Sequence, residues 1–83
     1  MIAVCAPTRR WADLIATRLD LGEKTTDWVY VARPSDARDL VVERIVAMEE
    51  PETMRSAYYG AILAAVQDSA GRNRVQIEWT TLW

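Results

Sequence analysis

Two adjacent arginines behind a threonine, Thr8, Arg9 and Arg10, form the segment best suited to bind an anion. They follow an apolar run and precede an amphipathic stretch, so we expect them at a helix N-terminus, where free N–H groups and the helix dipole favour negative charge. Arg33 and Ser35 follow a second apolar run, and we expect them to converge on the same region. The other interpretation is that Thr8 and Ser35 only cap helices while the arginines are solvated.

Two carboxylates, Glu49 and Glu50, end an apolar run that begins at Ile45. Some nucleotide-hydrolysing enzymes hold magnesium with carboxylates at a strand end. Such enzymes also need the phosphate loop G-x-x-x-x-G-K-[ST], whereas the three glycines and the single Lys24 are not so arranged, and G-x-G-x-x-G is also absent. We therefore interpret Glu49 and Glu50 as first-turn acidic residues that the dipole of the following helix favours, and we predict no metal site and no cofactor.

The chain contains no histidine and one cysteine, Cys5. The lack of histidine excludes Ser-His-Asp and Cys-His catalysis, imidazole acid–base chemistry and nearly every common zinc site. Cys5 lies within an apolar run, which favours a small buried hydrophobe over a reactive thiol. With no candidate catalytic residue, the sequence predicts a protein that is not an enzyme.

The elements that must position these residues begin with a strand at residues 2–6, continuously apolar as in a strand buried on both faces. A helix follows from Thr8 as N-cap to Gly22, with apolar residues at helical spacing. Residues 28–32 are aromatic and β-branched and predict a second strand. Strand, helix, strand indicates a parallel crossover.

The next segment has two physical interpretations. Residues 35–50 form one helix, or a helical turn at 35–40 precedes a strand at 42–48; we prefer the second because β-branched residues crowd the segment. Behind Pro51, residues 52–70 repeat at helical spacing, and we expect Gly71 to end this helix. Gly60 in its middle costs about 1 kcal/mol relative to alanine, which indicates close packing against a neighbour.

Residues 74–80 alternate between apolar and polar, as in an edge strand with one wet side. We expect Trp79 on its buried face, and Trp11 and Trp28 also in the core. Leu82 and Trp83 at the end of the chain are the candidate interface, because an exposed apolar pair suits a dimer contact. The alternative is that Trp83 folds back on its own domain.

Together these elements predict one small α/β domain over residues 1–83. The expected architecture is a small Rossmann-like, three- to four-stranded, mainly parallel sheet with flanking helices. If the turn at Ser35 is not helical, a ferredoxin-like β-α-β-β-α-β arrangement suits the same order of elements. A domain of this size buries only roughly 60 to 65% of its unfolded surface, so a homo-oligomer is a reasonable expectation.

The formal net charge of −2 comes from ten basic and twelve acidic residues that are interspersed along the chain. No basic tract calls for nucleic acid. The apolar runs are too short for a signal peptide or a membrane span, so we expect a cytoplasmic protein with no membrane association.

Two resemblances add to this. Residues 4–16, VCAPTRRWADLIA, resemble the strand–turn–helix that opens the second RecA-like lobe of helicases, but the arginine motif Q-x-x-G-R-x-x-R of that lobe is matched only by QDSAGRNR at 67–74, off by one on both sides. Helicase activity is therefore not implied. Over most of its length the chain is similar to small Rossmann-like or P-loop-like proteins of actinobacteriophages, through Leu21-Gly22 and the strand WVYV at 28–31.

The phage resemblance implies an α/β fold and a setting inside the host cytoplasm, and it brings no catalytic residues. We expect a non-enzymatic phage accessory or regulatory protein that binds a host or phage macromolecule, with a protein as the partner. The alternative is a degenerate nucleotide- or anion-binding domain that uses Thr8, Arg9, Arg10 and Arg33.

Overall fold

The computed structural model describes residues 1–38, 42–50 and 56–81. Within these ranges none of the helices is both long and apolar enough to cross a membrane. Strands and helices alternate along the whole described chain: β1 (Ile2–Cys5), α1 (Arg9–Arg18), β2 (Trp28–Tyr30), α2 (Pro34–Arg38), β3 (Arg44–Met48), α3 (Ala57–Asn73) and β4 (Ile77–Thr80).

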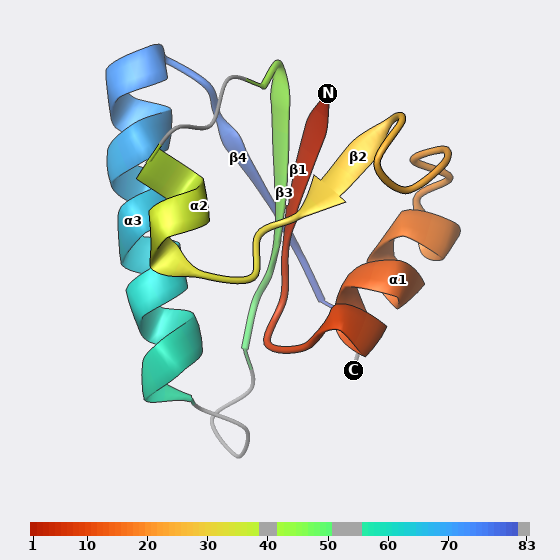
Figure 1. Ribbon diagram of the computed structural model, residues 1–83, viewed down its shortest axis with the longest axis horizontal. Helices are drawn as coiled ribbons and strands as arrows, with labels where there is room; N and C mark the ends of the chain where they lie inside the picture. Colours follow the sequence, from red (N-terminus) through yellow and green to blue (C-terminus); the bar gives the residue numbers. More distant parts are fainter. Residues whose placement is uncertain (39–41, 51–55, 82–83) are drawn as a thin grey trace.

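The described strands form one four-stranded, all-parallel sheet in the order β2-β1-β3-β4 (Figure 1). The N-terminal strand is therefore central, and Ile2 is in register with both Trp28 of β2 and Arg44 of β3. This arrangement confirms the small Rossmann-like α/β fold. The ferredoxin-like alternative is wrong, because β2 and β3 are parallel strands on either side of β1, joined through α2, rather than a hairpin.

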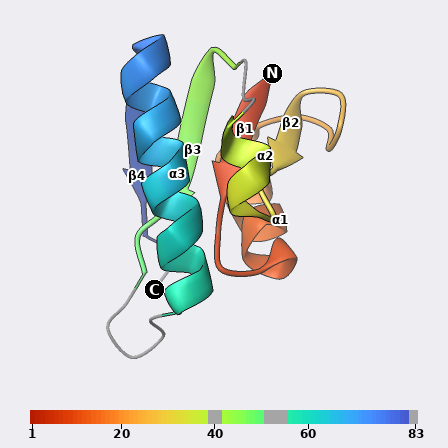
Figure 2. The same ribbon diagram turned by 60° about the vertical axis from the view of Figure 1, so that its left-hand side comes forward.

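Helices cover both faces of the sheet, as Figures 1 and 2 show: α1 lies on one face, and α2 and α3 lie on the other. Successive residues of β1 point to opposite faces, so Val4 packs under α1 whereas Ala3 and Cys5 pack under α2 and α3. The core on the α3 side is dominated by aliphatic residues of β3 and α3 and by Tyr59. All these strand residues are fully buried, as expected for a parallel sheet covered on both faces.

The preferred interpretation of residues 35–48 is confirmed, since α2 spans one short helical segment and β3 is a strand. The helix begins at Pro34 rather than at Ser35. Asp36 explains this start, because its Oδ2 accepts the backbone N–H of Arg33 at 3.2 Å, which fixes Arg33 at the capping position.

The predicted end of the long helix at Gly71 is wrong, because α3 continues to Asn73 and its left-handed residue is Arg74, with φ 57°. The N–H of Val75 then bonds to the carbonyl of Ala70 at 3.0 Å, and Val75 packs against the α3-side core. The packing of Val75 therefore determines where the helix ends more strongly than the low helix propensity of Gly71 does. Pro51, expected in the first turn, lies outside the described residues.

Two further expectations about packing are wrong. Trp79 is 45% exposed, because it lies on an edge strand at a point that α3 does not cover. Gly60 is exposed, and a Cβ built there meets nothing within 4 Å, so it does not mark a close approach. Trp28 is buried as expected, and Trp11 is partly buried against the α1-side core. Leu82 and Trp83, the candidate interface, lie outside the described residues.

Candidate functional site

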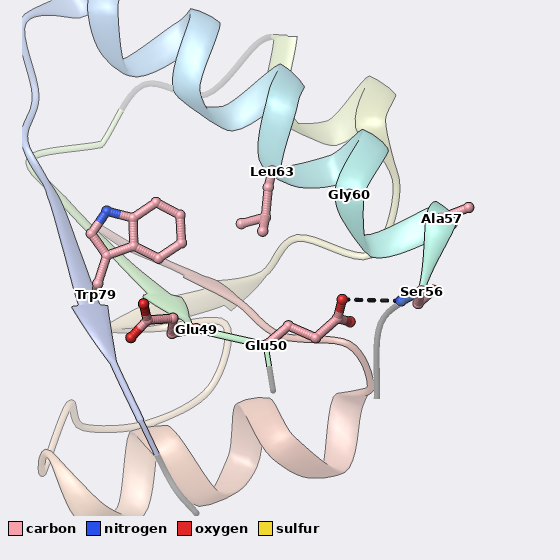
Figure 3. Close-up of a pocket in the computed structure, with 7 residues that line it drawn as sticks. All are labelled: Glu49, Glu50, Ser56, Ala57, Gly60, Leu63 and Trp79. Carbon is pink, nitrogen blue, oxygen red and sulfur yellow. Dashed lines mark hydrogen bonds between the residues drawn. The ribbon is translucent and has the colours of Figure 1, made fainter. Parts of the chain in front are cut away.

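A cleft of about 600 Å³ opens between the N-terminal half of α3 and the carboxyl ends of β3 and β4 (Figure 3). Its volume falls within the roughly 300–1,000 Å³ of typical ligand pockets. It also lies at the edge of the sheet where open α/β folds bind ligands. The described residues that line the cleft are Glu49, Glu50, Ser56, Ala57, Gly60, Leu63 and Trp79.

Three residues define the space between the helix and the sheet. Trp79 is in register with Ala47 of β3, so it points to the α3 side of the sheet, where it stands half-exposed at the edge. Gly60 contributes no side chain to the opposite wall, and Leu63 extends from α3 toward the same space. The sheet and the helix thus present an indole and an isobutyl group to solvent across a gap.

Glu50 links the cleft to the start of α3. Its Oε1 accepts the backbone N–H of Ser56 at 3.0 Å, and the Ser56 hydroxyl in turn accepts the N–H of Tyr59 at 3.3 Å as the N-cap. The other carboxylate oxygen, Oε2, is buried and accepts no hydrogen bond from any residue that the structure describes. The negative charge of Glu50 is therefore only partly compensated by hydrogen bonds from the described residues.

Glu49 is exposed, and its backbone N–H donates to Thr80 at 2.8 Å, which extends the pairing of β3 with β4 past the strand end. This bond holds the Glu49 carboxylate near Trp79, as Figure 3 shows. The expectation that Glu49 and Glu50 occupy the first turn of the helix is wrong, because α3 begins at Ala57 and its first turn holds no acidic residue. Both residues follow the end of β3 instead, from which the Glu50 carboxylate still reaches the N-terminus of α3, where the helix dipole favours it.

Tyr59 occupies the point where a Rossmann-like fold usually binds its ligand. That point lies between β1 and β3, whose following helices go to opposite faces of the sheet. Tyr59 is only 1% exposed, and its hydroxyl lies 2.6 Å from the carbonyl of Met48 and 3.1 Å from that of Cys5, the last residues of the two strands. Burial raises the pKa of this hydroxyl, which stays a hydrogen-bond donor. On the α3 side the protein's own side chain thus fills this position, and the cleft lies one strand further along.

The residues expected to bind an anion are divided between two helices. Thr8 caps α1, its Oγ1 accepting the N–H of Trp11 at 3.3 Å, and both Arg9 and Arg10 are exposed. Arg33 pairs with Asp36 at 3.5 Å, and Ser35 is exposed in α2, on the opposite face of the sheet from α1. Between described residues, no hydrogen bond or ion pair joins residues 8–10 to the α2 pair. Nothing in these contacts tests anion binding, which stays a prediction.

Cys5 is buried in the core of the sheet. Burial raises the pKa of the Cys5 thiol to about 12, so this side chain behaves as a core hydrophobe. Within the described ranges no group of three or more Asp, Glu or Cys side chains could hold a metal ion. The cleft is therefore the principal site feature of the described chain.

In the sequence, Glu49 and Glu50 stand out as carboxylates after an apolar run. The other lining residues do not, because the pattern predicts close packing for Gly60 and burial for Trp79, and nothing marks Leu63. The available signal was Gly60 itself, a helix-weakening residue on a helix facing an edge strand. No family model matches the chain, and searches of curated proteins and of solved structures find no significant similarity. Function is therefore argued from the geometry alone.

Proposed function

We propose that this chain is a binding domain that takes a short segment of a partner protein into the cleft between α3 and β4. The observation that carries the proposal is the exposed Trp79 facing Leu63 across a gap of about 600 Å³. Tryptophan is among the residues most enriched at the energetic centres of protein interfaces. The Trp79 indole is exposed rather than buried in the core, so it is the group that a bound partner would cover.

The size of the cleft favours a peptide segment over a single small group. A volume of this order accommodates a drug-sized molecule, comparable to a few amino-acid residues, and the cleft is open along one side. Its centre is apolar and its rim carries the carboxylates Glu49 and Glu50, which is the usual distribution of an interface with a polar rim.

Gly60 supports the proposal because it weakens the helix and no close packing compensates for this loss of stability. A glycine inside a helix destabilises it by roughly 0.5–1 kcal/mol relative to alanine. At a close helix contact that cost would be recovered, but here a Cβ would meet only open space. The bare position keeps the wall of the cleft clear.

The test is a selection of displayed random peptides against the folded protein, with two variants as controls. Gly60→Leu fills the cleft, whereas Gly71→Leu makes the same change on an exposed position of the same helix that does not line the cleft. Both changes raise helix propensity, so neither should unfold the protein.

We expect selected peptides to bind the wild-type protein and Gly71→Leu but not Gly60→Leu. In NMR spectra they should perturb the amide of Gly60 and the indole N–H of Trp79. If selection yields no peptide that distinguishes Gly60→Leu from the other two proteins, the proposal is wrong.

A further inference from the structure

We infer that the anchor of the bound segment is the guanidinium group of an arginine. This inference rests on the proposed function and deepens it by naming the chemistry of the group that the cleft recognises. Its basis is the charge of the cleft and the aromatic surface of Trp79.

The charge of the cleft selects a cation. Its described lining holds two carboxylates, those of Glu49 and Glu50, and no basic side chain. The N-terminus of α3 opposes them with an effective charge of about +0.5, and Glu50 already accepts one N–H at that end. Two formal negative charges therefore outweigh the helix dipole, and an anionic segment would be repelled.

The shape of the site distinguishes arginine from lysine. A planar guanidinium stacks on an aromatic face while its five N–H donors reach carboxylates at its edge, whereas an ammonium is a compact point charge. Figure 3 shows the Trp79 indole beside Glu49, with Glu50 on the far side of the same space. A flat cation lying along Trp79 would have carboxylates at its rim.

Two contacts elsewhere in the protein pair a cation with the same kinds of partner. On the opposite face of β4, Arg44 makes a two-pronged ion pair with Glu78, with Nε–Oε2 and Nη2–Oε1 distances of 2.6 and 2.9 Å. The ammonium of Lys24 lies 5.8 Å from the ring centre of Trp28. The cleft presents both partner types, carboxylate and indole, with the cation left to the ligand.

Glu50 adds to the charge argument. Its Oε2 is buried and accepts no hydrogen bond from the described residues, which provide a donor only to Oε1. The negative charge of this carboxylate is therefore only partly compensated within the described chain, and a guanidinium group in the adjoining cleft would be attracted to it.

The experiment compares matched ligands and matched variants. Peptides that bind the cleft are resynthesised with each arginine replaced by citrulline, its neutral isostere, or by lysine, and are titrated by calorimetry against the wild-type protein, Glu50→Gln and Glu49→Gln. Glu50→Gln keeps an oxygen that can accept the Ser56 N–H, so helix capping is preserved, and thermal unfolding checks this.

We expect citrulline to weaken binding by at least about tenfold, lysine to weaken it less, and Glu50→Gln to remove most of the difference between arginine and citrulline. Cleft-binding peptides that lack arginine, or that tolerate citrulline, overturn the inference and leave the proposed function standing. Failure to obtain any cleft-binding peptide overturns both. A single arginine with blocked amino and carboxyl groups is titrated as well. If it binds as tightly as the peptide, the rest of the peptide contributes nothing, and a peptide is wrong as the source of the guanidinium group.

Discussion

Replacing Tyr59 with phenylalanine tests whether its hydroxyl holds the carboxyl ends of β1 and β3 together. The ring is buried, so Tyr59→Phe keeps the packing and removes only the hydroxyl. A phenol hydroxyl has a single hydrogen to donate. The Met48 carbonyl, at 2.6 Å, is the closer of its two acceptors, so we count one hydrogen bond lost rather than two. One net hydrogen bond of about 1 kcal/mol, plus the penalty for a buried carbonyl left unpaired, gives a loss of about 2 kcal/mol.

For a domain of this length that loss lowers Tm by roughly 8–16 °C. The adjacent tyrosine is a matched control, because the hydroxyl of Tyr58 also donates to a backbone carbonyl, that of Ala32 at 3.0 Å, but its residue is 54% exposed. Water can replace it, so Tyr58→Phe should cost less than about 0.5 kcal/mol. The assay is thermal and urea unfolding followed by circular dichroism. Equal stabilities for the two variants would refute the reasoning.

Two other predictions concern α3 and the edge strand. Gly60→Ala and Gly71→Ala should each raise the free energy of unfolding by up to about 1 kcal/mol, because both glycines are helical and their Cβ positions are open; a loss of stability in urea titrations of either variant would contradict this. Arg44 lowers the pKa of Glu78, so their pair stabilises the fold above the ordinary carboxyl pKa and this stability is lost as pH falls through the lowered value. Because both side chains are more than a third exposed, the contribution is below about 1 kcal/mol, and urea midpoints of Glu78→Gln should lose that part of the acid dependence between about pH 6 and pH 3; unchanged acid dependence would count against the pair.

The alternation of strands and helices was predictable because each element carries its own local pattern. The crowded β-branched residues around Ile45 favoured a strand, and the structure has one there. Local patterns also predicted the start of α1, where Thr8 caps the helix as expected. The predicted end at Gly22 is wrong, because α1 ends at Arg18 and Asp20 already has a left-handed φ of 53°.

What the sequence does not encode locally is which helix covers which part of the sheet. Trp79 belongs to an alternating strand, and alternation distinguishes two faces but does not say whether the inward face is covered at that end of the strand. Gly60 has the same difficulty, since a bare helix position suits a close contact and an open cleft equally well. The cleft is a product of the relative lengths and placement of α3 and β4, so no local pattern indicates it. Glu49 and Glu50 stand out in the sequence only as carboxylates that follow an apolar run.

The phage setting and the anion site at residues 8–10 stay predictions. The hydroxyl of Thr8 already accepts the N–H of Trp11, so an anion there would rely on Arg9, Arg10 and the remaining free N–H groups.

The central position of β1 has a consequence for how the chain reaches its fold. β1 pairs with β3, whose residues lie about half the given chain away, and every described strand pair is parallel, so none can form as a local hairpin. Loop-closure entropy must be lost before those contacts return any free energy, which makes folding slower than in a helical domain of similar length. Until α3 is in place, α2 alone covers the apolar residues of β1 and β3 on that face, so a partly folded chain exposes apolar surface there.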